Sequence, residues 1–156
     1  MNNIKYILPL LTVVLTACNN VVENRNIPYA SVSFDIDVST SGCDYELRED
    51  MTGNSKIFTK EQPAKASAGW GAYGYSGVVV VRALDNKLYA FDICCPYEVK
   101  REIALKSDGF FMECPACGSQ FSVGNGSGYV NKGPATEPLK TYTVYRNGGD
   151  IFRVTN

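Results

Sequence analysis

Histidine is absent from all 156 residues of the chain. Its absence excludes Ser-His-Asp triads, Cys-His dyads, HExxH zinc sites and haem with a histidine axial ligand. An excess of one charge is also missing, because 15 basic residues face 16 acidic ones. Proteins that bind nucleic acid usually show a basic excess, so we expect no nucleic-acid partner. Six cysteines remain as the main candidates for metal or redox chemistry.

The chain begins with an apolar segment that is too short to cross a bilayer. Lys5 precedes the run at residues 6–15, whereas a spanning helix needs about 20 residues. The run ends in Leu15-Thr-Ala-Cys18, which resembles the bacterial lipobox, whose cysteine is lipidated and becomes the new N-terminus. We therefore expect residues 1–17 to be a lipoprotein signal peptide and Cys18 to be the lipidation site. An ordinary signal peptide with an incidental cysteine is the alternative.

A short polar segment follows the expected lipidation site. Residues 18–29 lack periodicity and include Pro28 near their end, which predicts a lipidated tether. The expected location is the cell envelope, where the protein is anchored by lipid, and Asn19 after the cysteine favours the outer membrane. This compartment permits disulfides. Residues 30–156 are then expected to form one domain.

Short strands dominate the expected domain. Residues 31–38 alternate between polar and apolar side chains, which predicts a half-buried strand. The β-branched run at 77–84 predicts a strand buried on both faces, and 87–92 returns from a turn at Asp85-Asn86. Further strands are expected at 55–59, 109–113, 120–123, 142–146 and 150–154. No amphipathic helix is expected, so the predicted class is all-β, a small sandwich or open barrel.

Two cysteine-bearing loops lie between the expected strands. The first contains Cys94-Cys95-Pro-Tyr97, and the second contains Cys114-Pro-Ala-Cys117-Gly-Ser119. A Gly133-Pro-Ala135 segment follows them. This arrangement resembles a Rieske [2Fe-2S] domain, which has a Cys-x-His box, a Cys-x-x-His-Gly-Ser box and a proline loop that covers the cluster. The resemblance covers residues 77–156.

The resemblance implies a particular fold and particular ligands. The fold would be a Rieske-like small β sandwich or open barrel with a rubredoxin-like, two-loop metal-binding subdomain. Cys95 and Cys114 fall on the thiolate positions of the family, and Ser119 on the hydroxyl that hydrogen-bonds a cluster sulfide. The chain is also similar to Rieske-like lipoproteins of Bacteroidota that carry these box variants.

The chain departs from the family at both imidazole positions. Tyr97 stands at the first and Cys117 at the second, and Cys94 is an additional thiol. The imidazoles give family members a higher potential than all-cysteine clusters have. The electron-transfer role of an ordinary Rieske cluster therefore cannot be carried over unchanged.

The thiols allow a metal site as one interpretation. Cys114 and Cys117 also resemble the metal knuckle of rubredoxins and zinc ribbons. The expected ligands are Cys95, Cys114 and Cys117, with Cys94, Tyr97 or water as the fourth. Such a set suits Zn²⁺, a single iron ion or an atypical [2Fe-2S] cluster.

Two other interpretations stay open. The thiols could form disulfides and hold no cluster; the resemblance then implies the pair Cys95–Cys114, and Cys94 with Cys43 is a further possibility. Redox catalysis by Cys114 and Cys117 is disfavoured, because thioredoxin-like pairs work at a helix N-terminus and no helix is predicted here.

Two functions follow from these interpretations. The first is a membrane-anchored iron–sulfur or metal-binding, electron-transfer module with an atypical cysteine site. The second is a non-catalytic structural or binding lipoprotein without a cluster. An envelope redox or assembly partner is expected in addition to the membrane. An enzyme activity of its own is not expected, because the chain has no room for a second, catalytic domain.

Overall fold

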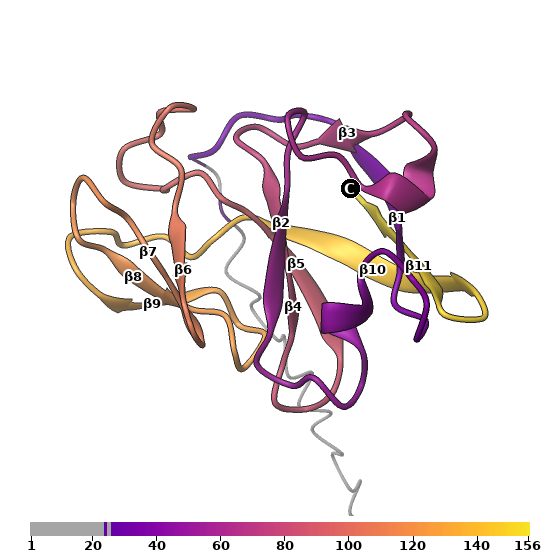
Figure 1. The fold of residues 1–156 in the computed structure, drawn as a ribbon. Helices are drawn as coiled ribbons and strands as arrows, with labels where there is room; N and C mark the ends of the chain where they lie inside the picture. The colour runs from indigo at the N-terminus through magenta and orange to yellow at the C-terminus, as the bar shows by residue number, and fades with distance from the viewer. Residues whose placement is uncertain (1–23, 25) are drawn as a thin grey trace, which may run out of the picture.

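Two antiparallel sheets make up the protein in the computed structural model, which describes Asn24 and residues 26–156 (Figure 1). The expected signal peptide and Cys18 lie outside these residues. The larger sheet has seven strands in the order β2-β4-β5-β10-β11-β1-β3 and the smaller has four in the order β6-β7-β8-β9. The prediction of an all-β fold is confirmed.

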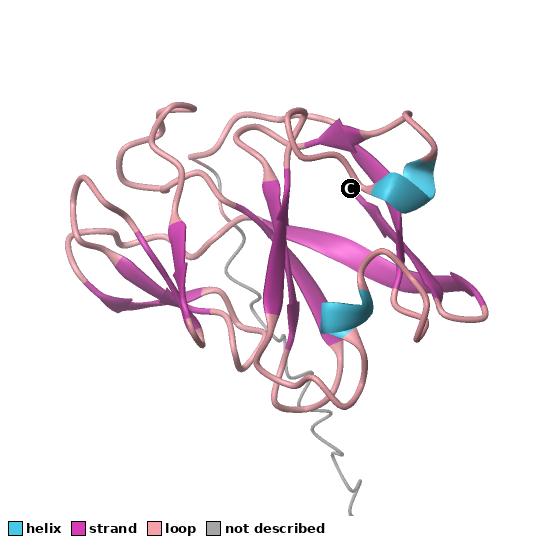
Figure 2. Ribbon diagram, viewed as in Figure 1, coloured by secondary structure: helices cyan, strands magenta, loops and turns pink. Residues whose placement is uncertain are grey.

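The strands of the larger sheet are β1 (Val32–Asp37), β2 (Ser55–Phe58), β3 (Ala72–Tyr73), β4 (Val78–Arg82), β5 (Leu88–Asp92), β10 (Thr141–Gly148) and β11 (Ile151–Thr155). Those of the smaller sheet are β6 (Lys106–Asp108), β7 (Phe111–Glu113), β8 (Gln120–Ser122) and β9 (Tyr129–Lys132). In the described part of the chain the only helical segments are the 3₁₀ turns η1 (Tyr45–Leu47) and η2 (Lys65–Ser67) (Figure 2). Among these residues no helix is long and apolar enough to cross a membrane.

Strand β1 shows why the alternating sequence forms a half-buried strand. Val32, Phe34 and Ile36 are buried, whereas the residues between them are only partly so. Side chains on a strand alternate between its two faces, so one face of β1 lies in the core. The ring of Phe34 packs 4.9 Å from that of Tyr73 and 5.1 Å from that of Phe58, measured between centroids.

Strand β4 contributes to both hydrophobic cores, as its unbroken β-branched sequence predicts. Val78 and Val80 belong to the core of the larger sheet, and Val79 and Val81 belong to the core below the smaller sheet. All four side chains are fully buried. Burying one valine contributes about 1.5–3 kcal/mol, so this strand joins the two halves of the domain energetically.

The smaller sheet is an insertion between β5 and β10, and it carries both cysteine loops. Its core includes Cys95 and Cys114 together with Phe91, Met112 and Phe121. The expected hairpin turn is present at Asp85-Asn86, and a second turn after Asn147 joins the paired strands β10 and β11.

Three strands were not expected from the sequence. Strand β3 has two residues, every residue of β6 is exposed, and β9 has only one residue that is even partly buried. None of them shows the apolar alternation that identifies a strand. Each lies at the edge of its sheet, where pairing rather than burial defines the strand.

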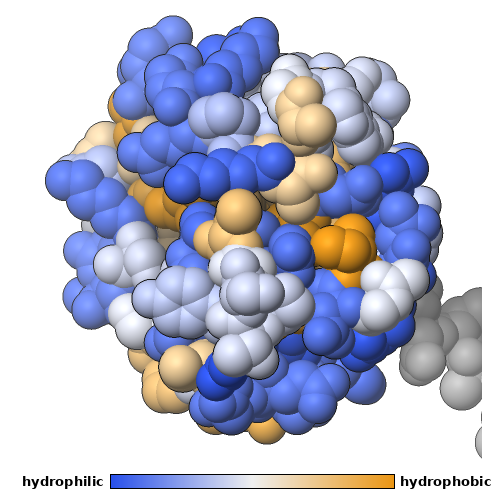
Figure 3. Space-filling view, turned by 45° about the vertical axis from the view of Figure 1, so that its right-hand side comes forward, coloured by the Kyte–Doolittle hydropathy of each residue, from blue (hydrophilic) through white to orange (hydrophobic). Residues whose placement is uncertain are grey.

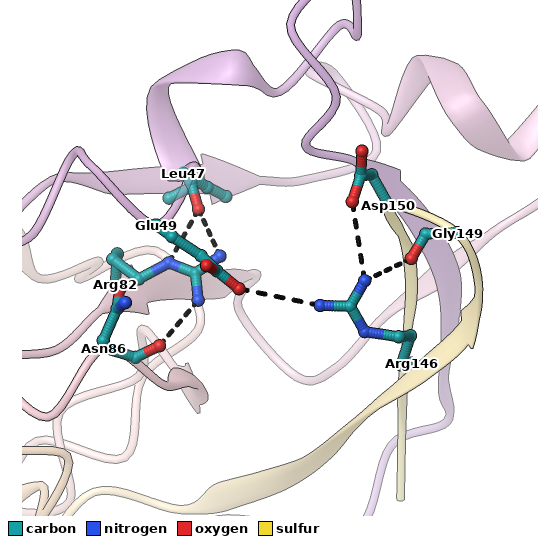
Figure 4. A network of polar contacts seen from close by, with 7 residues as sticks. All are labelled: Leu47, Glu49, Arg82, Asn86, Arg146, Gly149 and Asp150. Atoms are coloured by element: carbon teal, nitrogen blue, oxygen red, sulfur yellow. Dashed lines mark hydrogen bonds and ion pairs between the residues drawn. The ribbon is translucent and has the colours of Figure 1, made fainter.

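A polar network occupies the end of the molecule that carries the β10–β11 turn (Figure 4). The buried Arg82 guanidinium donates to Leu47 O at 2.6 and 2.8 Å and to Asn86 O at 2.9 Å. Arg146 pairs with Glu49 at 3.7 Å. Because these donors are satisfied within the chain, we interpret the network as support for η1 and the neighbouring turns.

On the face drawn in Figure 3, hydrophilic side chains cover most of the surface.

The carboxylate of Asp92, at the end of β5, is fully buried and accepts four hydrogen bonds. One oxygen accepts from Tyr75 N and Tyr142 Oη, both at 2.7 Å. The other accepts from Cys94 N at 2.8 Å and Ser76 N at 3.2 Å. Asp92 thus connects the loop before β4, which contains Tyr75 and Ser76, to Cys94 at the start of the first cysteine loop.

Tyr142→Phe is expected to destabilise the fold by about 1.5–3 kcal/mol at neutral pH, because Asp92 loses a charged hydrogen bond. Burial and the charge of Asp92 raise the pKa of Tyr142 well above its ordinary value. The folded state therefore keeps this proton when the unfolded state, with a pKa of about 10, has lost it. Stability of the native protein should fall as the pH rises above about 10, and the variant should lose part of this dependence.

Urea unfolding across alkaline pH measures both effects. Tyr145→Phe is the control, since Tyr145 is exposed and makes no hydrogen bond to Asp92. Equal alkaline slopes for native protein and Tyr142→Phe would contradict the prediction.

Candidate metal centre

The two cysteine loops are built as similar turns. Val99 N donates to Cys95 O at 2.9 Å, and Gly118 N donates to Cys114 O at 3.0 Å, so each turn closes four residues after its cysteine. The closing residue has a positive φ in both cases, +50° for Val99 and +70° for Gly118. A β-branched residue rarely adopts this conformation, and such strain gathers at functional sites. The two turns thus present two cysteines from a similar backbone.

Three sulfurs meet where these turns face each other. The Sγ atoms of Cys95, Cys114 and Cys117 all lie within 4.8 Å of one another. Cys95 and Cys114 are buried, and Cys117 is half-buried. The Sγ atoms of Cys95 and Cys117 are 3.7 Å apart. With metal–sulfur bonds of about 2.3 Å, the edge of a tetrahedron of sulfurs is about 3.8 Å, so this spacing fits two ligands of one ion.

Ser119 connects this group to the Gly133-Pro-Ala135 loop. Its fully buried hydroxyl accepts a hydrogen bond from Ala135 N at 3.1 Å and lies 3.1 Å from Cys117 Sγ. Since the oxygen accepts from the backbone, the hydroxyl proton is free to turn toward a Cys117 thiolate. Ser119 therefore both secures the covering loop and can stabilise negative charge on one ligand.

The surroundings give the thiols of Cys94, Cys95 and Cys117 different pKa values. Burial raises the pKa of Cys95 to about 12 and that of Cys94 to about 11. Partial burial also acts upward on Cys117, but hydrogen bonds from Ser119 and from the neighbouring thiols outweigh it and lower the pKa of Cys117. A metal must displace these protons before it binds, so occupancy is expected to decrease at low pH.

The other predicted site residues lie outside the sulfur group. The Cys94 thiol is buried and points to backbone oxygens, those of Cys95 at 3.7 Å and Lys100 at 3.9 Å. Tyr97 follows Cys95 but is 57% exposed. Cys43 is exposed and distant in sequence from both loops. Within the described residues, five cysteines have free thiols: Cys43, Cys94, Cys95, Cys114 and Cys117. They include Cys95 and Cys114, the pair that the resemblance implies for a disulfide.

Gly133→Ala is expected to weaken metal binding by displacing the covering loop. A Cβ at this position would lie 2.5 Å from Ser119 Cα and 2.8 Å from its hydroxyl, and φ is +102°. One of the two segments must shift, at a cost of about 1–3 kcal/mol. Titration with a chelator should show the metal released at a lower chelator concentration.

Gly69→Ala is the matched control for this change. Its φ is +88°, but a Cβ there would meet nothing within 4 Å. The control should carry only the backbone cost of a positive φ and leave metal retention unchanged. Equal metal retention in the two variants would show that the covering loop does not support the site.

Taken together, two cysteine turns and a covering proline loop on an all-β scaffold define a domain whose converging sulfurs could hold a metal ion. The family model of the Rieske [2Fe-2S] domain matches residues 48–143, which is more than half of the chain. The chain belongs to this family, and the resemblance seen in its sequence is confirmed. Members of the family are iron–sulfur electron-transfer modules.

A chain of the solved "Complex of reduced oxygenase and oxidized ferredoxin in carbazole 1,9a-dioxygenase" is among the structures to which part of this chain is similar. The TM-score is 0.41 with 23% identity, and the match covers 65% of the present chain and 88% of that one. No curated protein sequence matches the chain.

The residues present do not fit the histidine-ligated cluster of the family. The cluster needs two imidazoles on its second iron, and the chain contains no histidine. Of the two replacements, Tyr97 is largely exposed, and the Cys117 sulfur lies 3.7 Å from that of Cys95. In the family the positions of Cys95 and Cys117 serve different irons, whereas here the sulfurs of these two residues are nearly in contact. The donor set instead suits one soft or borderline ion.

Sequence reasoning missed the residues that position the site. Asp92 and Tyr142 are 50 residues apart, and the sequence identified Gly133 as part of the covering loop without showing that it packs on Ser119. A buried carboxylate at a strand end gives no sequence signal, because an aspartate in that place is usually solvated. The positive φ of Val99 was equally hidden, since valine is ordinarily a strand residue.

Proposed function

We propose that the chain is a lipid-anchored electron-transfer module that holds one iron ion on Cys95, Cys114 and Cys117. The observation that carries this proposal is the convergence of three sulfurs within 4.8 Å of one another, two of them buried. Thiolates hold the iron of iron–sulfur electron-transfer sites. The fourth ligand position is open to water.

The setting of the sulfur group supports electron transfer rather than catalysis. Cys117 is half-buried, so one ligand reaches toward the surface while Cys95 and Cys114 anchor the group in the core. Tyr97, on the turn beside it, is exposed. An ion held there would exchange electrons with a partner bound at this tip.

The proposed anchor is the lipid on Cys18, in the Leu15-Thr-Ala-Cys18 sequence. Residues 1–17 would be removed on maturation and the protein would lie in the cell envelope, at the outer membrane. A lipid-modified N-terminus gives stable membrane attachment when it carries more than one acyl chain. Mass spectrometry of the membrane-extracted protein should show an acylated N-terminal Cys18.

Metal analysis and visible absorption of protein purified without oxygen test the metal proposal. Stoichiometric iron with thiolate-to-iron absorption bands that bleach on reduction would support it. Stoichiometric zinc would overturn the electron-transfer role, whereas two iron ions with labile sulfide would overturn the single-iron site. Protein without metal, in which mass spectrometry finds Cys95 joined to Cys114 or Cys117, would favour a structural or binding lipoprotein instead.

A further inference from the structure

A segment follows the proposed lipidation site, and the C-terminal part of this segment is bound to the domain. We call Asn24 and residues 26–29 the strap. Asn24 Nδ2 donates to Pro138 O at 2.7 Å, and Asn24 Oδ1 accepts from Ile27 N at 3.0 Å. Asn24 and Ile27 are 7% and 4% exposed. Such burial shows that the strap is part of the folded domain.

The strap lies beside the loops of the metal centre. Asn26 Nδ2 donates to Pro96 O at 3.5 Å, directly after Cys95. Lys140 Nζ donates to Pro28 O at 3.1 Å. In Figure 1 the indigo start of the described chain lies near the loop from β5 to β6, while the β10–β11 turn lies at the opposite side. The strap therefore enters the domain at the end that carries the sulfurs.

The chain before the strap is short in comparison with the domain. Cys18 and Asn24 are six residue steps apart, which span at most about 22 Å when fully extended. A globular domain as long as residues 30–156 has a radius of gyration of about 14 Å and hence a diameter of about 36 Å. A domain anchored in this way cannot place its β10–β11 end on the membrane and its strap end on the distant side.

The side chains at this end suit a membrane surface. Tyr29, in the strap, is 77% exposed, and Tyr97 is 57% exposed. Lys140 Nζ lies 5.7 Å from the centroid of the Tyr29 ring. Tyrosine is enriched where one end of a side chain is apolar and the other is wet, and a lysine beside it attracts anionic headgroups.

We infer that the strap holds the metal-centre end of the domain on the lipid headgroups. This inference rests on the proposed lipidation of Cys18. It adds to that proposal an orientation, with Tyr29 and Tyr97 facing the bilayer and the β10–β11 turn facing away.

Photo-crosslinking in pure lipid vesicles tests the orientation. The lipidated protein is reconstituted into phosphatidylethanolamine vesicles with a minority of phosphatidylglycerol and a headgroup-bearing photoreactive lipid. Mass spectrometry then compares peptides around Tyr29 and Tyr97 with the peptide around the β10–β11 turn at 147–150. We expect labelling of the first two to exceed that of the turn several-fold. Equal labelling of both ends would overturn the inference.

A linker variant separates orientation from attachment. Inserting a flexible Gly-Ser segment of about 20 residues after Asn20 raises the maximal reach of the tether to about 94 Å, well beyond the domain diameter. The lipid and the metal content should persist, while the labelling ratio should fall toward equality. A ratio that stays unchanged would show that the tether does not set the orientation and would overturn the role of the strap.

Two further results keep this inference distinct from the proposed function. Preferential labelling that appears only in native membranes, and not in pure lipid, would overturn contact with the bilayer and indicate a protein partner. A mature protein without lipid on Cys18 would remove the proposed anchor and the inference together, whatever the metal analysis showed.

Discussion

Cys114→Ser is expected to lower the metal affinity of the domain by more than about 100-fold, since changes to residues that only support the ligands already cost 10–100-fold. A serine hydroxyl stays protonated at neutral pH and is a poor ligand for a soft or borderline ion. Cys114 is fully buried, so water cannot easily take the place of its sulfur. Metal content after dialysis and competition with a chelator measure the loss.

Two other cysteines of the chain provide the controls. Cys43→Ser should keep its full metal content, because Cys43 is exposed and lies outside the sulfur group. Cys94→Ser should behave like Cys43→Ser, since its thiol points to the carbonyls of Cys95 and Lys100. A loss of metal from Cys94→Ser as large as that from Cys114→Ser would instead identify Cys94 as the fourth ligand. Wild-type metal content in Cys114→Ser would exclude the trio as the site.

Asp92→Ala is expected to lower the free energy of unfolding by at least about 3 kcal/mol, because four donors lose their acceptor inside the protein. The affected groups are the hydroxyl of Tyr142 and three backbone N–H groups, including that of Cys94. The first cysteine loop begins at Cys94, so metal affinity should decrease as well. Chemical denaturation gives the first effect and chelator competition the second.

Asp92→Asn tests whether shape or charge matters at this position. The amide keeps the volume but presents N–H donors where one carboxylate oxygen accepted hydrogen bonds, so we expect most of the destabilisation to remain. Asp150→Ala, on the exposed β10–β11 turn, should change stability by less than about 0.5 kcal/mol. Comparable losses for Asp92→Ala and Asp150→Ala would refute the anchoring role of Asp92.

The long strands could be predicted because the pattern of apolar side chains in their sequences indicates which faces are buried. Val32, Phe34 and Ile36 alternate with polar residues and lie on one buried face, while Val78–Val81 do not alternate and are buried on both. Strand β6 could not be found in this way, because Lys106, Ser107 and Asp108 are all exposed. Its backbone pairs with β7, and backbone pairing leaves no pattern in a polar sequence.

The site could be predicted as far as its ligands but not as far as their arrangement. The family boxes identified Cys95, Cys114 and Cys117, which the fold brings together. The contact between the Cys95 and Cys117 sulfurs depends on how two turns face each other. The boxes say nothing of that geometry when the imidazoles are missing. The hydrogen bonds that fix the turns come from Asp92 and from the backbone, and neither follows from cysteine spacing.

The valines of β4 have a consequence for how the protein responds to its metal. Since Val78 and Val80 line one core while Val79 and Val81 line the other, neither core can open without exposing the strand that seals its neighbour. The domain should accordingly unfold as a single cooperative unit. An ion that binds only the folded form adds RT ln(1 + [M]/Kd) to the stability of that entire unit. Amide hydrogen exchange in β1, which β10 and β11 separate from β5 and its cysteine loop in the sheet, would then slow upon metal loading together with exchange in the ligand turns.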